Sequence, residues 1–173
     1  MAERDLLWIL RERAAKLATL QAAVDEQVTE ALVGFEIGGH RFAVPVQHVV
    51  YGGRLRHLTA IPSGPAYLLG VTALSGHLVS IVDLPELLGL RQRGLGDVTA
   101  GLVVALGARK LGLGAEQLLG IFEVPTARLS AYRHAGSITP RVVLAGTKSG
   151  EKNTLVLDIP ELFADARLGG AGG

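Results

Sequence analysis

The sequence predicts a mainly β protein preceded by one α-helix. From about residue 32 onward, apolar residues alternate with polar or small ones in short runs, and Gly-rich turns separate these runs. A period of two is typical of half-buried strands, and closely spaced short strands favour small barrels or a sandwich over a parallel α/β sheet. Part of this pattern occurs twice, which indicates two similar β units.

An amphipathic helix is expected over residues 5–30. Apolar side chains recur there at steps of three, four and seven residues, and intervening alanines favour helix. Such a helix can lie over its own domain, or it can bind a partner or a second copy of the chain, so self-association stays open. The expected organisation is an N-terminal helix at 1–31, a β domain at 32–165 and a flexible Gly-rich tail at 166–173.

The first hairpin is predicted from the clearest alternation in the chain. Val33–Ile37 alternates apolar and polar or small residues, Gly38-Gly39 suits the positive φ angles of a tight turn, and Phe42–Val46 alternates again. Pro45 lacks the N–H of a ladder bond, so its strand is expected at a sheet edge or ending in a bulge. Further strands are expected at Leu68–Leu74, Leu78–Val82, Leu102–Leu106, Lys110–Gly114, Ile121–Val124, Arg141–Ala145 and Thr154–Leu157.

Two stretches recur in the same order along the chain. Their separations, 69 and 75 positions, are nearly equal, as expected for a duplicated unit. We therefore expect two β units, at 32–90 and 100–165, each closed by a short helix. The matching stretches are residues 37–44 with 106–113, and residues 82–87 with 157–162.

The second repeated stretch contains the pattern Asp-x-Pro-Glu-Leu in both copies. Asp83 and Asp158 are each followed by Pro at the second position and Glu at the third. An Asp before a helix can accept hydrogen bonds from the first-turn N–H groups, and Pro in that turn lacks only an N–H that has no partner. We expect both carboxylates to cap helices, because a catalytic pair has no need to be duplicated.

No pattern in the sequence supports catalysis, a cofactor or a metal site. Cysteine is absent, which excludes disulfides, thiol catalysis and Cys-ligated metals. The five histidines have no second ligand at the spacing of a zinc motif, no Ser lies in a GxSxG turn, and the Gly-rich stretches match no phosphate-binding loop.

Nucleic-acid binding is not expected either. Lys and Arg number 17 against 16 Asp and Glu, so the net charge of +1 offers no electrostatic attraction for a polyanion. Small basic clusters occur at Arg54, Arg56 and His57 and at 91–93, but aromatic residues make up only 5% of the chain. Single-strand binders need aromatic platforms for base stacking.

No direct insertion into a membrane is expected. No apolar run reaches the length of a membrane span. The apolar residues near the start are soon interrupted by Arg11, Glu12 and Arg13, unlike the layout of a signal peptide. The expected location is therefore the cytoplasm.

Three ordered stretches resemble the CheW-like domain of bacterial chemotaxis coupling proteins. Phe35–Val46 is similar to the opening of that domain, Ile61–Val71 to its Pro-containing segment ending in Gly-Val, and Leu74–Leu84 to the strand pair that follows. Each stretch alone is a weak signal, but the ordered set is specific and covers about residues 32–165.

The resemblance implies two intertwined five-stranded barrels, similar to SH3 barrels, with a hydrophobic core between them. It implies a non-enzymatic adaptor that binds the regulatory domain of a CheA-type histidine kinase and the cytoplasmic tips of methyl-accepting chemoreceptors. The alternative is a divergent accessory member, serving surface motility or another chemosensory pathway, that binds the kinase or self-assembles without binding receptors.

The resemblance also assigns candidate site residues. Gly70, Val71 and Ser75 match positions linked to receptor binding, and Gly70→Asp is expected to weaken that binding without affecting the fold. Val49 and Tyr51 match a strand near the kinase-binding face. The family usually has Arg where this chain has Ser75, and often Glu where it has Tyr51.

Overall fold

The computed structural model describes residues 29–90, 98–126, 143–149 and 152–168. In the first copy of the repeat the elements are β1 (Thr29–Ile37), β2 (His40–Pro45), the 3-10 turn η1 (Val46–His48), β3 (Val49–Arg54), β4 (Leu68–Leu74), β5 (His77–Val82) and α2 (Leu84–Leu87). In the second copy they are β6 (Ala100–Leu106), β7 (Arg109–Ala115), β8 (Gln117–Pro125), β9 (Val143–Ser149), β10 (Lys152–Leu157), α3 (Ile159–Ala164) and the 3-10 turn η3 (Ala166–Leu168).

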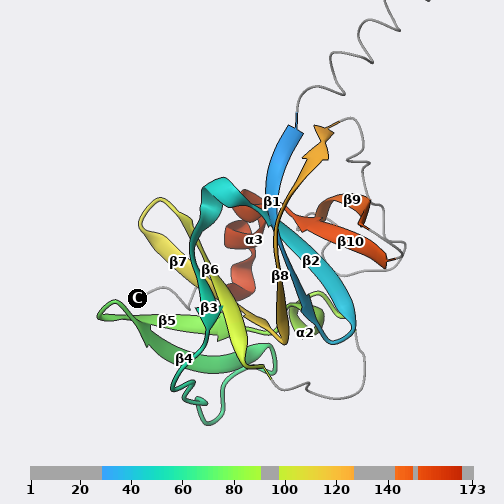
Figure 1. Cartoon of the computed structure of the whole chain (residues 1–173). Helices are drawn as coiled ribbons and strands as arrows, with labels where there is room; N and C mark the ends of the chain where they lie inside the picture. Colours follow the sequence, from blue (N-terminus) through green and yellow to red (C-terminus); the bar gives the residue numbers. More distant parts are fainter. Residues whose placement is uncertain (1–28, 91–97, 127–142, 150–151, 169–173) are drawn as a thin grey trace, which may run out of the picture.

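These strands form two five-stranded sheets, so the prediction of a mainly β fold is confirmed (Figure 1). The strand expected at Arg141–Ala145 lies at Val143–Ser149. The predicted helix lies outside the described residues except at its end. There the prediction is wrong, because Thr29 already begins β1 and pairs with Pro125 of β8.

Each sheet combines strands from both copies of the repeat. Sheet A has the order β8-β1-β2-β10-β9, and sheet B has the order β3-β6-β7-β5-β4. The copies are thus intertwined as expected, but the assignment of one barrel to residues 32–90 and another to 100–165 is corrected. The short turn η1 carries the chain from sheet A into sheet B, and a local pattern cannot reveal which sheet a strand joins.

The two sheets match strand for strand. Replacing each strand of sheet B by its counterpart in the other copy reproduces the order of sheet A. The register repeats as well: Ala43 lies opposite Val156 in sheet A, and the equivalent pair in sheet B is Gly112 and Ile81. This agreement confirms that the sequence repeat is a structural duplication.

Pro45 does not mark an edge strand. The strand that it ends, β2, lies between β1 and β10 in the middle of sheet A. The residue is tolerated because it is the last of the strand, beyond the pairs that Arg41, Phe42 and Ala43 make with β10.

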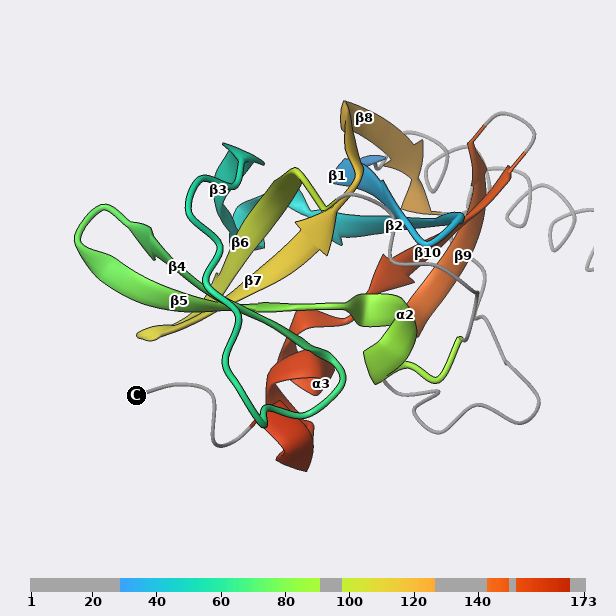
Figure 2. The ribbon, with the colours of Figure 1, turned by 90° about the horizontal axis from the view of Figure 1, so that it is seen from below.

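The largest hydrophobic core lies between the sheets, and each sheet also has a smaller core of its own. The main core takes side chains from both sheets and both helices, including Leu102 and Val104, whereas Val103 between them belongs to the small core of sheet B. In sheet A, Leu32 belongs to the small core and Val33 to the main core. Figure 2 shows the two sheets beside one another with the helices near the region between them.

The helix caps are built as predicted. The Asp83 Oδ1 accepts a hydrogen bond from the Glu86 N–H at 3.1 Å, and the Asp158 Oδ1 accepts one from the Glu161 N–H at 3.0 Å. Burial raises the pKa of the Asp83 carboxyl, against the opposing effect of the bond from Glu86. Both carboxylates are therefore engaged in the fold.

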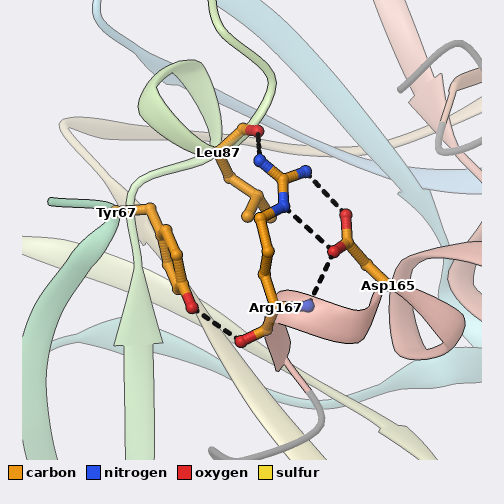
Figure 3. A network of polar contacts seen from close by, with 4 residues as sticks. All are labelled: Tyr67, Leu87, Asp165 and Arg167. Carbon is orange, nitrogen blue, oxygen red and sulfur yellow. Dashed lines mark hydrogen bonds and ion pairs between the residues drawn. The ribbon is translucent and has the colours of Figure 1, made fainter. Parts of the chain in front are cut away.

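The 3-10 turn η3, which we call the C-terminal turn, is held to the first copy by a polar network (Figure 3). The Arg167 guanidinium donates to both carboxylate oxygens of Asp165, at 3.0 and 2.6 Å, and to the Leu87 carbonyl at the end of α2, at 2.7 Å. The Tyr67 hydroxyl donates to the Arg167 carbonyl at 2.6 Å. The side-chain hydrogen bonds of Arg167 lower the pKa of the Asp165 carboxyl, although partial burial opposes this.

A first prediction concerns the small core of sheet B. Gly112 and Ile81 occupy the positions of Ala43 and Val156, so a larger side chain accompanies a smaller one. A Cβ on Gly112 would overlap the Ile81 Cδ1. Gly112→Ala should therefore lower the free energy of unfolding by about 1–3 kcal/mol, because it overpacks the core.

Adding Ile81→Val to Gly112→Ala removes that Cδ1 and reproduces the pair found in sheet A. The double variant should be more stable than Gly112→Ala alone, as measured by urea unfolding. Equal stability of the two variants would contradict this account of the packing.

A second prediction follows from the lowered pKa of Asp165. Because an unfolded Asp has a pKa of about 3.9, its ion pair stabilises the fold above that pH and is lost as the pH falls through the lower folded-state pKa. Asp165→Asn should therefore destabilise the protein most near neutral pH, and the difference from wild type should shrink below about pH 4. Urea unfolding across this range tests it; a difference that stays constant would contradict the assignment.

Candidate partner-binding site

All five expected site residues belong to sheet B or its turns, and four of them lie on its two edge strands. Val49 and Tyr51 lie on β3 at one edge. Gly70 and Val71 lie on β4 at the other, and Ser75 lies in the turn between β4 and β5. The structure thus separates the kinase-binding candidates from the receptor-binding candidates while holding both sets in one sheet.

On β3 the exposed apolar side chain is Val50. Val49 is half-buried against the main core, and Tyr51 packs on the small core of sheet B, where its hydroxyl donates to the Arg54 carbonyl at 3.0 Å. A bulge between Val49 and Tyr51 leaves Val50 outside the pairing with β6, and its side chain is 56% exposed. Sequence reasoning missed Val50 because simple alternation does not reveal a bulge.

The edge of β4 is covered by the segment that follows β3. The Val71 N–H donates to the Thr59 carbonyl at 2.9 Å, and the Thr59 N–H donates to the Val71 carbonyl at 2.8 Å. The buried Thr72 hydroxyl donates to the Arg56 carbonyl at 2.8 Å. Gly70 is itself buried, with a φ of 150°, and a Cβ there would overlap the Thr59 carbonyl. The glycine therefore permits a close approach of two backbone segments.

The second copy of the repeat shows whether the register shift in β4 is itself the reason for a glycine at position 70. A register shift between Leu68 and Gly70 recurs in β9, where the position equivalent to Gly70 is occupied by Ala145. The register shift therefore recurs at a position that is not glycine. The requirement for glycine comes from Thr59 and its neighbours.

The β4–β5 hairpin presents a second exposed apolar side chain, Leu78. Ser75 and Gly76 form its tip, with φ angles of 50° and 81°, as in a tight two-residue turn. Ser75 is exposed, and Leu78, opposite Ala73 in the register, is 74% exposed. Leu78 was not singled out from the sequence; its isolation among the otherwise buried apolar residues of β5 is visible only in the fold.

Arg54, Arg56 and His57 are exposed where the chain passes from the β3 edge towards the β4 edge. The two arginines add positive charge between the two candidate surfaces. The region therefore favours partners with acidic groups over basic ones.

Among the described residues, none of the titratable groups with a shifted pKa is a candidate partner-binding residue. Burial lowers the pKa of His40, and its buried Nε2 has no hydrogen-bond partner, but this residue lies at the start of β2 in sheet A. Among the described residues, no three His, Asp or Glu side chains gather in a way that could hold a metal ion. The helices of this part of the chain are too short and insufficiently apolar to cross a membrane.

A third prediction corrects the expectation that Gly70→Asp leaves the fold intact. Gly70 and Gly76 both have positive φ, but a Cβ on Gly76 meets no atom within 4 Å, whereas one on Gly70 overlaps Thr59. Gly76→Ala should cost about 1 kcal/mol through its backbone conformation. Gly70→Ala should cost at least about 1 kcal/mol more, because the Thr59 segment must move.

Chemical denaturation and amide exchange measure this difference. Gly70→Ala should also accelerate exchange of the Val71 amide, which Gly76→Ala should leave protected. If the two variants lose equal stability and protection, the close approach at Gly70 is not the reason for the glycine.

Comparison with known proteins identifies relatives of this chain. The model of the CheW-like domain matches residues 31–167. Protein FrzA of Myxococcus xanthus is 30% identical over 135 residues, which cover 77% of this chain and 84% of the relative. The chemotaxis protein CheW of Treponema pallidum is 27% identical over 158 residues, covering 85% and 88%.

A solved structure has the same fold. The scaffolding protein TtCheW from Thermoanaerobacter tengcongensis superposes with a TM-score of 0.66 at 17% sequence identity, covering 76% of this chain and 86% of that protein. The family model alone spans most of the sequence, including every strand from β2 to β10. The chain therefore belongs to the CheW-like domain family.

Proposed function

We propose that this protein is a non-enzymatic adaptor that couples chemoreceptors to a CheA-type histidine kinase in chemosensory signalling. The observation that carries the proposal is the presence of two separate exposed apolar side chains, Val50 and Leu78, towards opposite edges of one sheet. Each lies beside residues that match a partner-binding position of the family. The proposed location is the cytoplasm, with the kinase regulatory domain and the receptor tips.

In this proposal, coupling is positional. Sheet B holds the β3 edge and the β4–β5 hairpin in a fixed relation, because its five strands are hydrogen-bonded in one sheet and packed on two cores. A partner on one edge is then held at a defined distance from a partner on the other. Two modest interfaces on a rigid bridge give a stable assembly and allow the state of one partner to affect the other.

The relatives support the proposal through what their names state. TtCheW is described as a scaffolding protein, and the Treponema pallidum relative as a chemotaxis protein. Neither description names an enzymatic activity.

The proposal includes barrels of the SH3-like kind and an N-terminal helix. Closure of sheet B into a barrel is supported by the segment after β3. This segment makes hydrogen bonds next to β6 near one edge of the sheet and to β4 at the other edge. The Leu55 N–H donates to the Thr99 carbonyl at 3.0 Å next to β6, and Thr59 exchanges two bonds with Val71 of β4. The helix rests on the periodicity of the sequence alone.

A second candidate function is an accessory adaptor that binds the kinase, or a further copy of this chain, without binding receptors. It is favoured by Ser75, an exposed small residue at the hairpin tip where the family usually presents Arg. A short hydroxyl cannot make the long-range ionic contact of a guanidinium. Such a protein would serve surface motility or another specialised pathway.

A fourth prediction tests the two surfaces with matched substitutions. Val50→Asp should weaken binding of a CheA-type regulatory domain at least about tenfold and leave receptor binding unchanged, and Leu78→Asp should do the reverse, because each buries a charge in only one interface. Titration calorimetry against a kinase regulatory domain and a receptor-tip fragment measures both. Ile121→Asp is the control, because Ile121 is 69% exposed but lies in sheet A.

Ser75→Arg separates the two candidate functions. A gain in receptor affinity on top of measurable wild-type binding supports the coupling adaptor, and receptor binding only in the Ser75→Arg variant supports the accessory adaptor. Absence of kinase and receptor binding by the wild-type protein at roughly 100 μM, where weak micromolar interfaces are detectable, would refute the coupling adaptor and the kinase-binding form of the accessory adaptor.

A further inference from the structure

Among the described residues, this polar network is found at the C-terminal turn that follows α3. α2 and α3 are equivalent, and the residue equivalent to Asp165 in the first copy is Leu90, which packs against the main core. Ending the helix and covering the core therefore do not require a carboxylate at this point. The duplication of the fold alone therefore does not explain the Asp165–Arg167 pair.

The network reaches the start of β4 through Tyr67. The Tyr67 carbonyl accepts from the Asp83 N–H at 2.8 Å, and its hydroxyl donates to the Arg167 carbonyl at 2.6 Å. Its ring packs against the main core. The guanidinium of Arg167 is meanwhile held by Asp165 and by the Leu87 carbonyl. The acceptor that Tyr67 uses is thus a carbonyl fixed by a bidentate ion pair (Figure 3).

The surface loop before β4 is consequently anchored at two points. One anchor is the pair of hydrogen bonds between Thr59 and Val71, and the other is Tyr67. Between them run exposed residues that include Ile61, 42% exposed, and the buried Gly70 pressed against the Thr59 carbonyl. Gly70 lies close against the Thr59 backbone, and Val71 is hydrogen-bonded to Thr59. A small rotation at Tyr67 would therefore also shift Gly70 and Val71.

We propose that the Tyr67–Arg167–Asp165 network is a positioning device, through which the C-terminal turn sets the conformation of residues 60–71 and so the affinity of the β4 edge for its partner. The assignment of that edge to receptor binding rests on the proposed function. The positioning itself does not, since it concerns only contacts within this chain. Tyr67 and Arg167 act through the loop and are positioning residues.

Tyr67→Phe isolates the effect, because it keeps the ring in the core and removes only the hydroxyl. We expect the amide protons of Thr59 and Val71 to exchange about tenfold faster, the change that corresponds to loss of one hydrogen bond of ordinary strength. Amide protons of β6 and β7, at the centre of sheet B, should keep wild-type exchange. Thr29→Val is the matched control, because it removes a hydroxyl that donates to Glu123 in sheet A at 3.3 Å.

Arg167→Gln provides a second route to the same loop. It breaks the bidentate pair and releases the turn, so Tyr67→Phe should have less effect on exchange in the Arg167→Gln background than in the wild-type chain. Unchanged exchange at Thr59 and Val71 in Tyr67→Phe would overturn the proposal. So would an equal acceleration throughout β6 and β7, because that pattern indicates general loss of stability.

Binding completes the test with full-length protein. Tyr67→Phe should weaken association with a receptor-tip fragment several-fold and leave association with a kinase regulatory domain unchanged, which a general loss of stability would not do. Faster exchange with unaltered receptor affinity would overturn the control of affinity. If the wild-type protein binds no receptor fragment, the proposed function fails, while the exchange data still decide whether the network positions the loop.

Discussion

The apolar core between the two sheets is the interaction on which the rest of the structure depends. Neighbouring residues of one strand serve different cores, as Leu102 and Val103 do in β6, so both faces of the sheet are packed along much of its length. A slip of one residue would exchange the two sets of side chains. Because each sheet also takes strands from both copies of the repeat, neither copy can form its sheet alone.

Because packing determines the interior of the sheets, partner binding is expected at the edges of sheet B. Interior positions are occupied by close-packed apolar side chains, and a larger residue at one position accompanies a smaller one at its neighbour, as the pairs Ala43–Val156 and Gly112–Ile81 illustrate. The exposed apolar side chains of sheet B, by contrast, lie on a bulge and on a hairpin strand, where the packing does not determine them. An adaptor with rigid bridges and variable edges can change partners without changing its fold.

Local patterns predicted much of this structure. Strand positions, the helix caps at Asp83 and Asp158, and the duplication follow from periodicity and short-range hydrogen bonding, which depend on nearby residues. The exchange of strands between copies could not be predicted in the same way, because alternation specifies which face of a strand is buried but not which strand lies beside it. The Tyr67–Arg167 bond joins residues 100 positions apart and has no local signal.

The candidate site shows both what the sequence could predict and what it could not. The resemblance identified Gly70, but the reason for a glycine there became visible only with Thr59 placed against it.

Within a duplicated fold, what both copies share is what the architecture requires, and what one copy alone contains needs another explanation. By that criterion the bulges and caps are architectural. Gly70 rather than alanine, Leu78 rather than Asn153, and Asp165 rather than leucine are three positions at which the copies differ. The first two lie at the β4 edge and its hairpin. The third belongs to the network that anchors the same edge through Tyr67, so these three differences concern one surface.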